Sequence, residues 1–192
     1  LGKAFLGLAL GLVWLIPFYL MVTNSFKTKQ EIFTNPLKFP EAFTFENYPE
    51  AFRQLDFIRT LANSLLITVS SVIIIVIFSA MAAYALERIK SKFSTITFMV
   101  FVAAMLVPFQ SVMIPLVALF GKAQMLNQIG IIFMYLGFGG SMSIFLYHGA
   151  MKSIPRALDE AAIIDGASRW QVFWKVIFPM LKPTTVTVAV LN

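Results

Sequence analysis

Cysteine is absent from the 192-residue sequence, histidine occurs once, and only 12% of the residues are charged. Without cysteine, the sequence offers no disulfide, no thiol nucleophile and no thiolate metal site. His148 has no carboxylate three or four residues away, so we expect an amphipathic side chain near a helix end rather than a metal ligand. The phosphate-binding Walker pattern is also missing, since Gly121-Lys122 is followed by Ala123 and lacks the upstream glycine. We therefore predict no catalytic residue, no metal ligand and no nucleotide held by this chain itself.

Apolar residues are abundant where charge is scarce. They make up 59% of the sequence, and the mean hydropathy is +0.82. In soluble domains about a quarter of the residues are charged, so this composition predicts an integral membrane protein. The formal net charge is +6, but the Lys and Arg residues lie between apolar runs and not on one basic face. We expect them to set membrane topology, and we predict no nucleic-acid partner.

Five apolar segments are expected to span the membrane, which predicts an all-α, polytopic helical bundle in one transmembrane domain covering 1–192. Their approximate bounds are 4–25, 61–86, 93–119, 127–150 and 174–192. The first four reach the roughly 20 residues that a span needs. Pro108 and Pro115 predict a kink or a re-entrant end in the third. Only ten residues follow Lys182, and ten helical residues cover about 15 Å, so we expect the fifth span to be cut short.

The loops between these segments predict an orientation. Arg88, Lys90 and Lys92 form a basic cluster that the positive-inside rule assigns to the cytoplasm. Alternation then places the amino terminus and the loop 152–173 inside, and the loop 27–60 outside. The outer loop balances five basic against five acidic residues and contains three prolines, which predicts a folded external loop without long regular structure.

A polar, helix-prone stretch, 153–183, interrupts the apolar sequence. Ser153 is expected to cap a short helix that Pro155 opens, and Gly166 is expected to end it. Ser168 with Gln171 forms a second capping pattern, after which apolar residues lead back towards the membrane. The pattern predicts a short amphipathic helix in the loop between two spans.

The composition of this short helix favours contact with a protein. Asp159 and Glu160 make its polar side acidic, while small residues such as Ala161 and Ala162 let another backbone approach closely. Glu160 can meet a basic group or a helix amino terminus on a partner. The alternative is a helix lying on the bilayer surface, which would instead favour bulky apolar residues opposite a Lys/Arg-rich face.

One motif can be followed along this stretch. Its residues are Glu160-Ala161-Ala162, Asp165-Gly166-Ala167, Ile177-Phe178-Pro179 and Pro183. They resemble the EAA cytoplasmic-loop signature of the membrane subunits of binding-protein-dependent ABC importers. The neighbouring Ile154-Pro155 and Phe173, and Phe45-Glu46-Asn47-Tyr48 in the outer loop, make the sequence most similar to the maltose-type carbohydrate branch. Phe178 stands where that family more often has leucine.

This resemblance implies a type I ABC importer permease fold, with a sixth span in the full-length protein. It implies that Glu160, Ala161, Ala162, Asp165 and Gly166 dock on a cytoplasmic ABC ATPase dimer. ATP and Mg²⁺ would be bound by that dimer, so no cofactor is expected in this chain. The other implied partners are a second similar permease, an extracytoplasmic solute-binding protein, a sugar substrate and membrane lipid. The implied location is the bacterial inner or plasma membrane, in which the chain passes several times with a cytoplasmic amino terminus.

Charged residues are absent from the first four predicted spans. Ion-coupled carriers usually keep such groups in the membrane for function, so their absence disfavours a secondary carrier. An ABC importer for an amino acid, a peptide or phosphate is the nearer alternative. Four uncharged polar residues are candidates to line a path for a neutral, hydroxyl-rich solute, and bonding between helices is their alternative role. They are Asn63, Ser64, Gln110 and Ser111.

Overall fold

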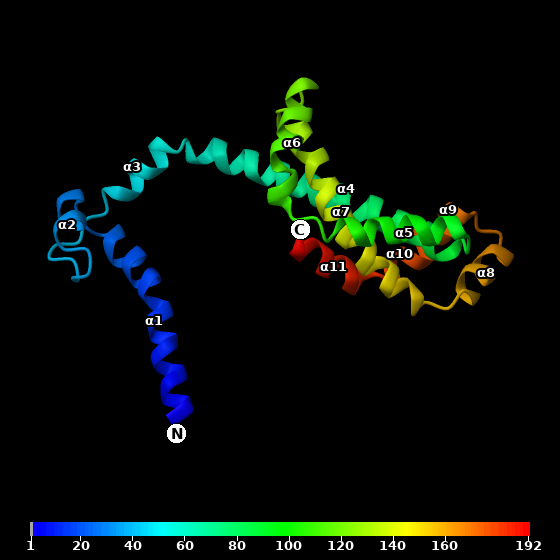
Figure 1. The fold of residues 1–192 in the computed structure, drawn as a ribbon, viewed down its shortest axis with the longest axis horizontal. Helices are drawn as coiled ribbons and strands as arrows, with labels where there is room; N and C mark the ends of the chain where they lie inside the picture. The colour runs from blue at the N-terminus through cyan, green and yellow to red at the C-terminus, as the bar shows by residue number, and fades with distance from the viewer. Residues whose placement is uncertain (1) are drawn as a thin grey trace. The chain divides into compact units, whose positions relative to one another are not determined.

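The computed structural model describes residues 2–192, and all regular elements in that range are helices (Figure 1). The all-α class predicted from the sequence is confirmed. Contacts divide the chain into two compact units, one ending at Asn63 and one comprising Ser64–Asn192. The single transmembrane domain stays a prediction.

The first unit contains one long apolar helix and two short ones. α1 (Gly2–Ser25) is apolar enough to cross a membrane over Ala4–Ser25. α2 (Lys29–Thr34) is capped by the hydroxyl of Thr28, and α3 (Asn47–Gln54) follows after irregular backbone. The predicted outer loop thus contains short helices in addition to irregular chain.

A buried lysine fixes the segment between α1 and α3. Lys27 is fully buried, and its Nζ donates hydrogen bonds to Asn24 Oδ1 at 2.8 Å and to the carbonyl oxygens of Asn35 at 2.9 Å and Pro36 at 3.1 Å. The side-chain amide of Asn47 donates to the Lys27 carbonyl at 2.7 Å. A buried charge needs such partners, so these bonds define the local fold.

Two long apolar helices form the centre of the second unit. They are α4 (Phe57–Arg88), most of which lies in this unit, and α7 (Gln128–Lys152). Ala80 and Ala83 of α4 are fully buried, and Ser79 Oγ donates to the Gly140 carbonyl of α7 at 3.5 Å. Small residues at the contact allow the two backbones to approach closely.

Two glycines of α7 lie at this contact. A Cβ added at Gly139 would collide with the side chain of Asn192 and lie 2.9 Å from Ile75 Cδ1 of α4, and one at Gly140 would lie 3.9 Å from Ser79 Oγ. A Cβ at Gly137 would have no neighbour within 4 Å, so the glycine-rich segment is closely packed at part of its length only.

The third predicted span is broken into two helices. α5 (Lys92–Ala104) and α6 (Phe109–Lys122) meet at 101°. Pro108 has no N–H to continue the helix and keeps the preceding residue out of the helical region, so the chain turns there. Pro115, by contrast, lies within α6. In Figure 1, α6 points away from α5, while the ring of Phe109 at the start of α6 lies 5.2 Å from that of Phe138 of α7.

The segment expected to form the fifth span consists of several short elements. They are a π-helical turn (Phe173–Ile177), α10 (Phe178–Met180) and α11 (Lys182–Leu191), and the short α9 (Arg169–Val172) precedes them. Within residues 2–192, three helices are long and apolar enough to cross a membrane, or four if the bent pair α5–α6 is one span. An all-helical membrane protein is thus confirmed, while five spans and a sixth stay predictions.

The local signals around 153–171 have mixed outcomes. The cap predicted at Ser153 is wrong, because α7 runs on to Lys152 and Ser153 Oγ donates back to the Ala150 carbonyl at 2.7 Å. α8 (Ala157–Ile164) begins later and has no side-chain cap. Gly166 lies just after the end of α8, as predicted, with a positive φ of 87°, and the Ser168–Gln171 capping box is confirmed.

Candidate functional site

α8 carries two adjacent carboxylates in opposite environments. Asp159 is 8% exposed, whereas Glu160 is exposed. Consecutive residues of an α-helix point about 100° apart, so one side chain can face inward and the next outward. Ala162, three residues after Asp159, is half-buried and packs against the core of the second unit. α8 therefore has one anchored side and one open side.

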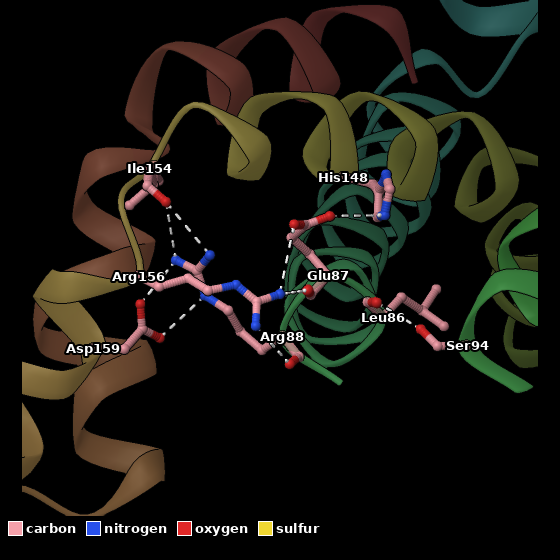
Figure 2. Close-up of polar contacts among 8 residues, drawn as sticks. All are labelled: Leu86, Glu87, Arg88, Ser94, His148, Ile154, Arg156 and Asp159. Atoms are coloured by element: carbon pink, nitrogen blue, oxygen red, sulfur yellow. Dashed lines mark hydrogen bonds and ion pairs between the residues drawn. The ribbon is translucent and has the colours of Figure 1, made fainter. Parts of the chain in front are cut away.

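The anchored side is bound to the last turns of α4 (Figure 2). Arg88 Nη2 lies 2.8 Å from Asp159 Oδ2, and Arg88 Nε donates to Oδ1 at 3.2 Å. Tyr84 Oη donates to the same Oδ1 at 2.7 Å, and Arg88 also donates to the Ile154 carbonyl at 3.4 Å. The Arg88 and Asp159 side chains are only 13% and 11% exposed. Removing either partner would leave a charge shielded from water without compensation.

A second set of bonds joins the loop before α8 to the end of α4. Arg156 donates to the carbonyl oxygens of Glu87 and Arg88, and its Nη2 lies 3.9 Å from Glu87 Oε1. These carbonyls belong to the last turn of α4, where a helix has no internal donors left. Glu87 Oε2 also lies 3.2 Å from His148 Nε2 of α7, and Figure 2 shows these two side chains facing each other. The loop is thereby fixed to the end of α4, and Glu87 in turn links α4 to α7.

His148 therefore has a more buried place than the sequence indicates. It is 8% exposed and stacks on Phe98 of α5, with ring centroids 4.0 Å apart. Its contact with Glu87 crosses from α7 to α4. No carboxylate lies three or four residues from His148 in the sequence, because its partner Glu87 is 61 positions away along the chain.

The open side of α8 carries most of the predicted docking residues. Glu160, Ala161, Asp165 and Gly166 are exposed, and Ala162 is half-buried. The structure thus brings the five together around the end of α8 and the turn that follows it. Their role in docking stays a prediction.

A groove of 420 Å³ runs between α8 and the end of α4. Its lining includes three arginines, Arg88, Arg156 and Arg169, together with Glu160 and Ile163. It extends the open side of α8 with a surface of mixed charge. Such a surface suits side chains of another protein that carry both charges.

The predicted solute-path residues lie on two different helices. Asn63 and Ser64 are adjacent on α4, while Gln110 and Ser111 occupy the first turn of α6. All four are exposed. Their role in a solute path stays a prediction.

Tyr84, Arg88 and Asp159 form the anchor that sequence reasoning missed. From the sequence, Arg88 is interpreted only as part of a basic cluster that sets membrane topology. Asp159 is interpreted only as an acidic residue of a short helix. One sequence signal could have indicated the anchored side of α8. Asp159 and Ala162 are three residues apart, so they lie on the same side of a helix. No local pattern relates Asp159 to Arg88, however, since 71 positions separate them.

Comparison with known proteins adds a separate finding. Residues 75–192 match the family model described as "Binding-protein-dependent transport system inner membrane component". The chain is 55% identical over 188 residues to the probable starch degradation products transport system permease protein AmyC of Thermoanaerobacterium thermosulfurigenes. The aligned residues cover 98% of this chain and 69% of that protein.

Two further relatives are similar over almost the same range. The multiple sugar-binding transport system permease protein MsmG of Streptococcus mutans is 37% identical, covering 95% of this chain and 66% of its own length. The melibiose/raffinose/stachyose import permease protein MelC of Bacillus subtilis is 34% identical, covering 92% and 64%. The chain thus spans slightly less than two thirds of the length of these two relatives.

Proposed function

The chain belongs to the family of binding-protein-dependent transport system inner membrane components, and we propose that it is a permease subunit of an ATP-driven importer for a sugar or oligosaccharide. The observation that carries the proposal is the two-sided helix α8. Its open side presents the motif residues, while its other side is bonded to the end of a membrane-capable helix. The names of the three relatives above all refer to sugars or starch products, which supports carbohydrate as the substrate class.

We infer that α8 acts as a coupling helix. Glu160, Ala161, Asp165 and Gly166 meet a cytoplasmic ATPase subunit, which binds ATP and Mg²⁺. A displacement of α8 then acts on α4 through Asp159 and its bonds to Arg88 and Tyr84. Because charge-assisted bonds between poorly exposed groups are costly to break, the last turns of α4 move with α8. This movement contributes to the alternation between inward-facing and outward-facing states.

The proposal includes further partners. A second, similar permease completes the transmembrane pathway, and an extracytoplasmic solute-binding protein docks on the outer loop 27–60 and delivers the sugar. The protein resides in a bacterial cell membrane with its amino terminus in the cytoplasm. The relative with 55% identity is named for starch degradation products, so malto-oligosaccharides are the first substrates to test.

An importer for an amino acid, a peptide or phosphate is the second candidate within the same class. The names of the relatives above favour carbohydrate over these solutes. A secondary carrier would leave the exposed acidic side of α8 without a partner. It would also be expected to hold charged groups within its spans.

The test uses the full-length protein co-expressed with its transporter subunits. We expect the ATPase subunit to co-purify in detergent, and maltotriose with the binding protein to stimulate ATP hydrolysis after reconstitution in liposomes. Glu160→Lys should weaken ATPase retention by about tenfold or more, because reversing an interfacial charge creates repulsion. Ser153→Lys is the control, since it adds positive charge to an exposed position of the same loop outside the motif. A protein that purifies alone and transports sugar without ATP would overturn the proposal.

A further inference from the structure

A basic pocket lies on the other side of the α4 end from α8. It has a volume of 520 Å³ and is formed by the end of α4, the start of α5 and the end of α7. Three lysines line it: Lys90 from the turn after α4, Lys92 from the start of α5 and Lys152 from the end of α7. We propose that this pocket binds the headgroup of an anionic phospholipid.

The charge of the pocket favours an anion. Glu87 is the only acidic residue in its lining, and that carboxylate already contacts His148 at 3.2 Å and Arg156 at 3.9 Å. The three lysines are exposed at the pocket and face no other lining carboxylate. Basic pockets between transmembrane helices are the setting in which anionic lipid headgroups bind.

The start of α5 adds donors to the same place. Ser91 caps this 13-residue helix and accepts a hydrogen bond from the Ser94 amide at 3.0 Å. The amides of Lys92 and Phe93 precede it and have no carbonyl partner within the helix. A helix start also carries partial positive charge, which favours a phosphate group.

The remaining wall distinguishes a lipid from a free anion. Leu86, Phe98 and Met99 line the pocket, and Met99 is 58% exposed on α5. α5 is part of a membrane-capable helix pair, so this apolar wall continues along a surface that hydrocarbon can cover. A phospholipid would place its phosphate among the lysines and an acyl chain along Met99. Inorganic phosphate or a nucleotide would leave that wall unused.

The experiment measures lipid retained by the full-length transporter after purification from mixed phosphatidylglycerol and phosphatidylcholine. Native mass spectrometry should show phosphatidylglycerol bound preferentially. The triple variant K90Q/K92Q/K152Q should bind it about a hundredfold more weakly, since each lysine near an anionic headgroup contributes about fivefold. The control K122Q/K175Q/K182Q removes the same charge from exposed positions outside the pocket and should keep the preference.

Two further outcomes would overturn the proposal. Equal loss in both triple variants would show that general electrostatics, and not the pocket, retains the lipid. Displacement of phosphatidylglycerol by millimolar inorganic phosphate would show a site for a small anion. Met99→Asn provides an independent check, because it should weaken lipid retention while leaving the lysines in place.

Discussion

Two polar segments, 26–56 and 153–172, interrupt the apolar helices, and they are stabilised in different ways. The first is held by its own residues: the Lys27 ammonium bonds to neighbours within nine positions, and Phe26 packs on the rings of Phe43, Phe45 and Tyr48. The second depends on residues far away in sequence, above all through Asp159 and Arg88. A segment of the first kind can keep its shape independently. One of the second kind transmits its movement to a long helix.

This difference suits the two proposed roles. A surface that receives a solute-binding protein requires a stable shape, and local bonds can provide it. A coupling helix requires a firm connection to the spans, which only bonds between distant parts of the chain provide. Each prediction below tests one side of this contrast.

The largest effect is expected from removing the buried arginine. Arg88→Ala leaves Asp159 unpaired at 11% side-chain exposure and should lower the free energy of unfolding by about 3 kcal/mol. Arg53→Ala breaks an ion pair of 2.6 Å whose side chains are 79% and 40% exposed, and it should cost less than about 0.5 kcal/mol. Thermal unfolding in detergent measures both. Equal effects would contradict the distinction between the two segments.

A smaller, local effect is expected in the first segment. Lys27→Met removes the donor that satisfies Asn24 and the two carbonyl oxygens of Asn35 and Pro36, at a cost of about 2 kcal/mol. Hydrogen exchange should rise in 26–48 and stay unchanged in 153–172, whereas exposed Lys29→Met should change neither. An equal rise in both segments would show that the first is not self-contained.

The smallest stability effect is expected at the turn after α8. Gly166 has φ of 87° with open space around it, so Gly166→Ala should cost about 1 kcal/mol through backbone strain alone. Gly149 lies inside α7, also in open space, so Gly149→Ala should be neutral or stabilising because alanine favours helix. In thermal unfolding, Gly166→Ala should therefore lower the unfolding temperature, while Gly149→Ala should leave it unchanged or raise it. A stabilised Gly166→Ala variant would contradict the turn geometry.

The sequence predicted those features that depend on neighbouring residues. Hydropathy located the long apolar helices, Pro108 marked the break between α5 and α6, and Gly166 and the Ser168–Gln171 box defined the turn after α8. Ser153 misled because a serine can cap the end of one helix or the start of the next, and the length of α7 decides which.

The anchor of the candidate site was beyond local reasoning. Asp159 and Glu160 are chemically similar neighbours, and only the packing of α8 against α4 separates an internal ion-pair partner from an exposed charge. That packing joins residues more than 70 positions apart, which no short pattern records. The motif residues could be named from the sequence. The bonds that connect α8 to α4, and would transmit the effect of docking, could not.

The most direct test of the central claim uses the absence of cysteine from the 192 residues. Ala161→Cys places a single thiol on the open side of α8, and Ala42→Cys places one at an exposed position of the first polar segment. A cross-linker with one thiol-reactive and one amine-reactive end is then applied to membranes that contain the assembled transporter. We predict that Ala161→Cys joins the ATPase subunit, with a yield that changes when ATP is bound, and that Ala42→Cys does not. No cross-link from Ala161→Cys, or equal cross-linking from both positions, would contradict the assignment of α8 as the coupling helix.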